Sequence, residues 1–218
     1  MKDLQENNIP AEHQNEDCYF PDLNKGIRVL FVGNSITKHA PKPEVGWNND
    51  CGMEASALEN DYVHILKKRI REIHPDASFA ILQVADFERQ FEFFDIENNY
   101  RAAIDFDADI ITMLFGANVP KEYRTSTDDP VRFGDRYREL RKALDKSGNA
   151  KVAHMEGFYM LSKIDGEREE AAKEFGDTYI KMGETRTKEE ARGHFNHPND
   201  LGMKEIADKF WNTIKEWM

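Results

Sequence analysis

IRVLFVGNSIT, residues 27–37, is the stretch of this chain that decides the fold. Its apolar, largely β-branched run over residues 27–32 predicts a buried strand, and the Gly33-Asn34-Ser35 that follows predicts a tight turn. Open α/β sheets bind ligands beyond the carboxyl ends of their strands, so this turn would present the Ser35 hydroxyl at a ligand-binding edge. The same residues are also typical of a helix cap or a simple turn, and the segment alone favours neither interpretation.

Apolar runs and amphipathic segments alternate along the rest of the chain. This alternation predicts βαβ units, and hence an α/β fold whose mainly parallel sheet is covered by helices on both faces. We interpret residues 1–24 as a polar N-terminal arm, and residues 25–218 as one domain. The connection over residues 34–58 is long and rich in Pro, Gly and Asn, which is typical of a functional loop. The further predicted strands are residues 78–84, 109–115 and 151–158, and the predicted helices are residues 62–74, 97–105, 133–146, 167–175 and 201–217.

Length, charge and cysteine usage exclude several classes of protein. The 218 residues fit a single sizeable core, and 30 Lys and Arg against 41 Asp and Glu give a net charge of −11. That charge disfavours nucleic acid and anionic membranes as partners, since both need a basic surface. We find no apolar run of about 18 residues and no signal-peptide pattern, and the two cysteines form no disulfide framework. We therefore expect a cytoplasmic protein, and the sequence leaves open whether it is a homo-oligomer.

Three polar groups are predicted at strand ends or at the start of a helix. Ser35 follows the first predicted strand, Asn118 follows the third, and His197 lies in the turn before the last helix. Acyl transfer needs a hydroxyl nucleophile, a base and hydrogen-bond donors for the oxyanion, and these three side chains meet those needs. Loops at the strand ends of a doubly wound sheet can bring such distant residues together.

Four short blocks in this order carry a resemblance to a known family. They are GNSIT (33–37), GWNNDCGM (46–53), GAN (116–118) and HPN (197–199). Over about residues 26–217 the chain resembles the GDSL-type esterases of the SGNH hydrolase superfamily, with Asn34 where many members have Asp.

The resemblance implies a fold and a set of roles. The implied fold is a flavodoxin-like three-layer α/β/α sandwich with about five strands. Ser35 would be the nucleophile and His197 the general base, and the N–H groups of Ser35 and Gly52 with the Asn118 side chain would form the oxyanion hole. Chains with this GNSIT opening resemble members associated with carbohydrate deacetylation. The implied substrate is a small-molecule or oligosaccharide ester, and O-acetyl groups on carbohydrates are the favoured class. No cofactor or metal is implied.

One position departs from the family pattern. The family usually places an Asp three residues before the catalytic histidine, where it orients the ring, and this chain has His194 there. Loss of the orienting acid lowers turnover by about 10⁴ in a serine protease. We favour a Ser-His dyad in which a backbone carbonyl orients His197, and the alternative is an acid from elsewhere, such as Glu156.

The same residues are compatible with other interpretations. His194, His197 and Asp200 have the spacing of a weak metal site, but Pro198 and the absence of further ligands disfavour it. Asp200 is better explained as a charge in the first turn of the last helix. Trp47 would either close the substrate pocket or pack the long loop, and the sequence favours neither role. A ligand-binding protein with little turnover on the same scaffold is the second hypothesis for function.

Overall fold

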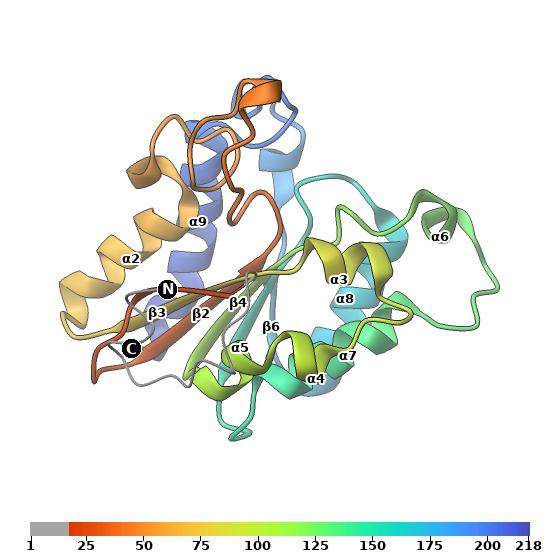
Figure 1. Cartoon of the computed structure of the whole chain (residues 1–218), viewed down its shortest axis with the longest axis horizontal. Coiled ribbons are helices and arrows are strands. Elements are labelled where there is room, and N and C mark those ends of the chain that lie inside the picture. Colours follow the sequence, from red (N-terminus) through yellow and green to blue (C-terminus); the bar gives the residue numbers. More distant parts are fainter. Residues whose placement is uncertain (1–17) are drawn as a thin grey trace.

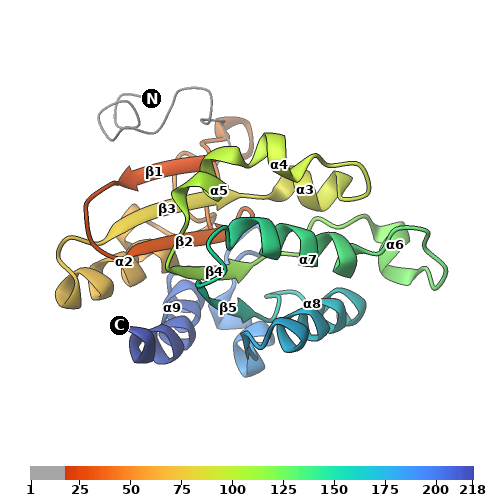
Figure 2. The same ribbon diagram turned by 90° about the horizontal axis from the view of Figure 1, so that it is seen from below.

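The apolar runs form a six-stranded sheet in a computed structural model of the chain, which describes residues 18–218. Five strands are parallel, and β1 pairs antiparallel with β3 at one edge. Figure 2 shows the order β1-β3-β2-β4-β5. The strand β6 pairs with β5 at the other edge of the sheet. The strands are β1 (Cys18–Asp22), β2 (Arg28–Gly33), β3 (Ser78–Gln83), β4 (Ile110–Leu114), β5 (Lys151–Met155) and β6 (Thr178–Ile180).

The order of the parallel strands sets the position of the site. In chain order the five parallel strands are arranged 2-1-3-4-5, which is the flavodoxin-like order. Their order reverses between β2 and β4, where Gly33 is in register with Leu114. The loops that follow these two strands therefore leave the sheet in opposite directions and open a crevice between them. The expected α/β/α sandwich with a mainly parallel sheet is confirmed, and β1 is an additional antiparallel strand.

Two long helices cover one face of the sheet (Figure 1). They are α2 (Tyr62–Ile73), which Asp61 caps by accepting a hydrogen bond from His64 N–H, and α9 (Asp200–Ile214). The apolar stripes of both helices belong to one buried cluster with residues of β2, β3, β4 and β5, and Tyr62 stacks on Phe210 between the two helices. Ile73, the last residue of α2, is 49% exposed.

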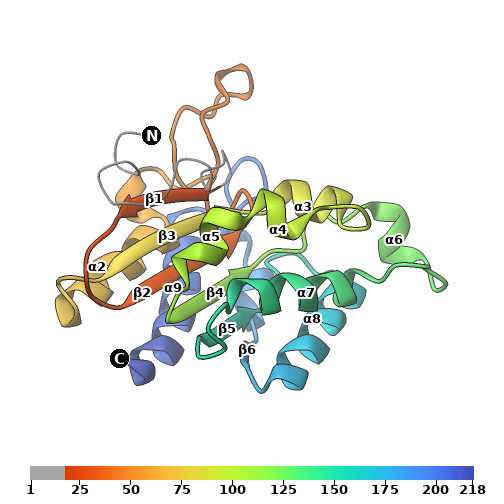
Figure 3. The ribbon, with the colours of Figure 1, turned by 60° about the horizontal axis from the view of Figure 1, so that its bottom comes forward.

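The remaining α-helices cover the other face, as Figure 3 shows for α4, α5 and α7. Five aromatic rings of this layer, none more than 2% exposed, pack against one another with centroids 5.0–6.4 Å apart: Phe87, Phe91, Phe115, Phe133 and Tyr137. The helices on this side are α3 (Ala85–Gln90), α4 (Ile96–Asn99), α5 (Arg101–Phe106), α6 (Lys121–Thr125), α7 (Phe133–Leu144) and α8 (Ser162–Phe175). The short 3-10 helices of the fold are η2 (Pro43–Val45), η3 (Leu58–Asn60), η4 (Gly183–Arg186), η5 (Glu189–Ala191) and η6 (Lys215–Trp217).

Two strands were not located from the sequence. Both lie at edges of the sheet: β6 has only three residues, and β1 lies in a polar segment with no long apolar run. β1 falls within residues 1–24, predicted as an arm, and residues 1–17 lie outside the described residues. Within residues 18–218 no helix has both the length and the apolar character needed to cross a membrane.

Gly33 at the end of β2 tests how closely the turn packs. A Cβ atom there would overlap the Thr37 side chain and lie 2.8 Å from the Leu114 carbonyl oxygen. Thr37 is buried and its hydroxyl lies 2.7 Å from that of Tyr62, so it cannot easily move. We predict that Gly33→Ala lowers the free energy of unfolding by about 3 kcal/mol in urea denaturation.

Gly166 in α8 provides the matched control, since nothing lies within 4 Å of the Cβ that alanine would add there. Gly166→Ala is expected to raise the free energy of unfolding by up to about 1 kcal/mol through helix propensity. Equal stability of Gly33→Ala and the unmodified protein would contradict the packing described for the turn.

Candidate active site

Asn34 and Ser35 have different roles in the turn after β2. The Asn34 carbonyl accepts hydrogen bonds from Thr37 N–H at 2.9 Å and Lys38 N–H at 3.0 Å, and its side-chain oxygen accepts from Ile36 N–H at 3.3 Å. Asn34 therefore forms the turn, as one of the two interpretations of the segment proposed. Ser35 lines an open cleft of about 530 Å³ beyond the strand ends.

His197 meets Ser35 across this cleft, although 162 residues separate them in the chain. Ser35 Oγ lies 2.8 Å from His197 Nε2. His197 is held in the turn before α9, where Gly193 N–H donates to the His197 carbonyl at 2.8 Å. The turn ends at Asn199, whose side-chain oxygen caps α9 by accepting from Leu201 and Gly202. The structure thus brings together the predicted hydroxyl and imidazole.

The second ring nitrogen of His197 determines how the dyad is protonated. His197 Nδ1 lies 3.0 Å from the Phe195 carbonyl oxygen, which can only accept a hydrogen bond. Nδ1 therefore carries the proton, and Nε2 is left as an acceptor for the Ser35 hydroxyl. Burial lowers the pKa of His197, against the smaller opposing effects of the Phe195 carbonyl and the Glu54 charge. The imidazole is accordingly neutral near pH 7, as a general base must be.

Neither Glu156 nor the side chain at position 194 takes the place of the Phe195 carbonyl beside this ring. Glu156 accepts from Met182 N–H at 2.9 Å and pairs with Arg186 at 3.0 Å, away from the dyad. At the position of the usual Asp, His194 donates its backbone N–H to Glu54, and its ring meets that of Phe195 edge to face at 4.9 Å. Of the two arrangements considered from the sequence, the structure has the one supported by a carbonyl.

A buried carboxylate, Glu88 of α3, holds the third predicted group in place. Its oxygens accept from Asn118 Nδ2 at 2.5 Å, Asn118 N–H at 3.3 Å, Asn34 Nδ2 at 3.0 Å and the Gly116 N–H. Burial raises the pKa of Glu88, and the four N–H donors oppose that effect. The Asn118 side chain is thereby fixed on the lining of the cleft that also contains Ser35 and His197.

Gly52 does not have the contact that the family resemblance implies. Its N–H, expected in the oxyanion hole, donates to Asp61 Oδ2 at 3.1 Å, so it already has a buried acceptor. The neighbouring Met53 N–H donates to the Ser35 carbonyl at 2.8 Å. This loop therefore supports the backbone of Ser35 but offers no Gly52 donor to the cleft.

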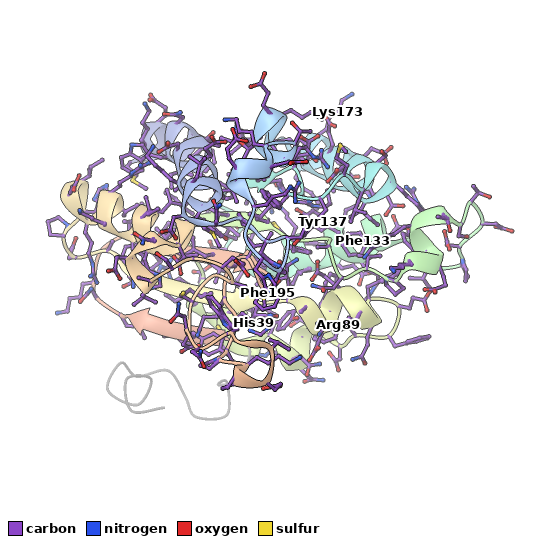
Figure 4. The ribbon with its side chains drawn as sticks, turned by 90° about the horizontal axis from the view of Figure 1, so that it is seen from above. His39, Arg89, Phe133, Tyr137, Lys173 and Phe195 are labelled. Atoms are coloured by element: carbon purple, nitrogen blue, oxygen red, sulfur yellow. The ribbon has the colours of Figure 1, made fainter. Side chains whose placement is uncertain are left out.

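Trp47 packs in the core instead of closing the pocket. It is 6% exposed, is absent from the cleft lining and donates its ring N–H to the His39 carbonyl at 3.3 Å. The aromatic groups on the lining are Tyr19 and Tyr159, and the Tyr159 ring meets the His197 ring edge to face at 6.1 Å. Figure 4 labels two further lining residues, His39 and Arg89, together with Phe195 from the loop that carries His197.

The possibility of a metal site at the start of α9 is not supported. Asp200 accepts from the Ser56 N–H at 2.7 Å, the Ser56 hydroxyl at 2.6 Å and Asn60 Nδ2 at 3.1 Å, and so fastens the long connection to α9. Across residues 18–218 no group of three or more His, Cys, Asp and Glu side chains is placed to hold a metal ion.

Sequence reasoning missed two acidic residues at this site. Glu88 directly follows Phe87 in a segment rich in phenylalanine (residues 87–94), so a charge next to this apolar segment is an available signal. Glu54 lies in the long connection after β2, where no sequence pattern distinguishes it from Glu44 or Glu59.

Comparisons with known proteins identify the fold. No family model and no curated protein matches the sequence. Among solved structures, one named as a GDSL-like lipase from Parabacteroides merdae has a TM-score of 0.60 at 17% identity, covering 88% of this chain and 96% of that one. An acetylxylan esterase from Geobacillus stearothermophilus has a TM-score of 0.54 at 15% identity, covering 87% and 94%.

A third structure is a family two carbohydrate esterase from Clostridium thermocellum in complex with cellohexaose. It has a TM-score of 0.56 at 15% identity, and the match covers 90% of this chain and 66% of that one. At these identities the likeness establishes the fold. It is the fold that the resemblance to the SGNH hydrolases implies, so that expectation is confirmed at the level of architecture.

Replacing Glu88 with glutamine tests whether the carboxylate holds the site together. Gln exchanges one acceptor oxygen for an NH₂ group that faces N–H donors, so at least one buried donor loses its partner. We predict that Glu88→Gln lowers the free energy of unfolding by about 3 kcal/mol in urea denaturation. Glu92→Gln, which removes an exposed carboxylate four residues later, is expected to change it by less than about 0.5 kcal/mol. Equal effects of the two substitutions would refute the role given to Glu88.

Proposed function

We propose that this chain is a serine esterase that hydrolyses small esters through an acyl-enzyme on Ser35. One observation carries the proposal. The Ser35 hydroxyl, both nitrogens of His197 and the Phe195 carbonyl form a continuous hydrogen-bonded relay with links of 2.8 and 3.0 Å. The relay opens on a cleft of about 530 Å³, which leaves room for a substrate beside the hydroxyl.

The relay supplies each proton transfer that ester hydrolysis needs. Ser35 Oγ attacks the ester carbonyl carbon while its proton moves to His197 Nε2, and the Phe195 carbonyl stabilises the imidazolium that forms. The tetrahedral intermediate collapses as His197 donates that proton to the leaving alcohol. Water then attacks the acyl-enzyme with His197 as base, and the proton returns to Ser35 as the carboxylic acid leaves.

The proposed oxyanion hole has two donors, the Ser35 N–H and the Asn118 side chain. Asn118 Nδ2 carries two hydrogens, of which one is directed to Glu88, so the other remains for a substrate oxygen. Removal of one such donor typically costs ~100–1,000-fold in turnover. Gly52 is not assigned to the hole, because Asp61 accepts its N–H.

We further propose O-acetyl groups on carbohydrates as the substrate class. The cleft lining combines the rings of Tyr19 and Tyr159 with polar side chains such as Gln83 and Arg89. Sugars present both apolar ring faces and hydroxyls, which such a lining suits. Support also comes from proteins of the same fold, namely the acetylxylan esterase and the carbohydrate esterase crystallised with cellohexaose.

A second candidate is a ligand-binding protein on this scaffold with little turnover. Two observations favour it: His194 occupies the position of the usual acid, and the Gly52 N–H is taken by Asp61. The two candidates differ in whether an acyl-enzyme forms, because binding alone transfers no acyl group to Ser35.

Release of p-nitrophenol from p-nitrophenyl acetate separates the two candidates. For the unmodified protein we predict a burst followed by steady turnover. For Ser35→Ala we predict a rate at least about 1,000-fold lower, because the nucleophile is lost. Ser147→Ala removes an exposed turn hydroxyl and is expected to behave like the unmodified protein.

Acetate release from acetylated xylan and mannan oligosaccharides, measured with the same variants, tests the substrate class. Ser35-dependent release is the expected result. If Ser35→Ala and the unmodified protein release p-nitrophenol equally, the esterase proposal fails and the binding protein is the better conclusion.

A further inference from the structure

The loop that carries His197 is held by a carboxylate from a distant segment. Glu54 Oε2 accepts the His194 N–H at 2.9 Å, and Glu54 Oε1 accepts the Phe195 N–H at 3.0 Å. The two oxygens therefore grip consecutive backbone amides of one loop. The Phe195 carbonyl belongs to that loop and accepts a hydrogen bond from His197 Nδ1. The two hydrogen bonds to Glu54 therefore determine the direction in which this carbonyl points.

The backbone of Glu54 and the glycine at position 193 both accommodate this contact. Glu54 has a φ of 79°, a left-handed conformation that a residue with a Cβ rarely adopts and that persists only where its surroundings enforce it. Opposite it, a Cβ on Gly193 would overlap Glu54 Oε2 and lie 2.6 Å from Glu54 Cδ. A glycine at position 193 is therefore required for the carboxylate to sit where it does.

The segment that carries Glu54 also supports the nucleophile. Met53 N–H donates to the Ser35 carbonyl at 2.8 Å, and Glu54 is the next residue. Residues 53 and 54 thus contact the backbone on both sides of the dyad. A displacement of this segment would change the distance between Ser35 Oγ and His197 Nε2.

We infer that Glu54 is a positioning residue that takes over, through the backbone of the loop at residues 194–195, the task of the acid missing at position 194. The usual acid would bind the imidazole directly. Here the carboxylate orients a carbonyl, and the carbonyl orients the ring. The kinetic consequence of this inference rests on the proposed esterase function, whereas its geometric consequence for His197 does not.

The charge of Glu54 also affects the pKa of His197. The negative charge raises the pKa of His197, as does the Phe195 carbonyl, while burial has the largest effect and lowers it. The other groups that face the ring are His39, whose charge lowers this pKa, and the uncharged ring of Tyr159. Removal of the Glu54 charge should therefore move the titration of His197 to lower pH.

The test compares Glu54→Gln with the unmodified protein. Gln keeps the size of the side chain but places an NH₂ group against one of the two amides. We predict that kcat for p-nitrophenyl acetate falls by about 100-fold with little change in KM, since the dyad is displaced. The acid limb of the kcat/KM profile should shift to lower pH. Glu59→Gln, which removes an exposed carboxylate from the same connection, should leave both unchanged.

A second variant fills the space beside Gly193 that the Glu54 carboxylate occupies, and it keeps the charge of Glu54. Gly193→Ala pushes the Glu54 carboxylate from the loop, and it should lower kcat to a similar extent. Circular dichroism shows whether each variant is folded, so that loss of the dyad geometry is distinguished from loss of the fold. Unchanged kcat in both folded variants would overturn the inference.

NMR of the His197 ring separates this inference from the proposed function, because it needs no substrate. A lower His197 pKa in Glu54→Gln shows that the Glu54 charge lies close to the ring, and faster solvent exchange of the His197 Nδ1 proton in that variant supports the positioning role, even if no ester is hydrolysed. If the two proteins titrate alike, the inference is wrong even when Ser35-dependent hydrolysis confirms the esterase.

Discussion

The candidate site depends on one constraint, the burial of the Glu88 carboxylate beneath four N–H donors. An unpaired charge in a protein interior is strongly unfavourable, so Glu88 is tolerated only while its donors remain in place. Those donors come from the ends of the two central strands, Asn34 after β2 and Gly116 and Asn118 after β4. The carboxylate therefore joins the two loops at the point where the strand order reverses. Ser35 and Asn118 face the same cleft because Asn118 and Asn34, the residue before Ser35, share this acceptor.

The dyad shows how backbone groups can replace a missing side chain. A carboxylate beside a catalytic histidine fixes its tautomer and stabilises its positive charge. In this chain the Phe195 carbonyl fixes the tautomer through His197 Nδ1, and the Glu54 charge acts from farther away. The weaker electrostatic support is consistent with a His197 pKa lowered by burial. A neutral imidazole is suited to removing the Ser35 proton, although less suited to holding it than one beside a carboxylate.

Much of the fold and the three groups facing the cleft could be predicted from the sequence, since they depend on local patterns. Apolar runs located the four central strands, and polar residues directly after them located Ser35 and Asn118. The rest depends on contacts between distant residues. Nothing near Gly52 in the sequence indicates that Asp61 accepts its N–H, nor does the loop pattern show that Trp47 is buried. The edge strands β1 and β6 are too short or too polar to produce a clear signal.

Mass spectrometry of the protein quenched in acid during reaction with p-nitrophenyl acetate tests the central claim most directly. A covalent acyl-enzyme must appear as a mass increase of one acetyl group, and peptide mapping locates it. We predict that the acetyl group lies on Ser35, and that it disappears as turnover exhausts the substrate. Acetylation confined to other nucleophiles, such as Lys38 or His39 on the same cleft, with Ser35 unmodified throughout, would contradict the proposed mechanism.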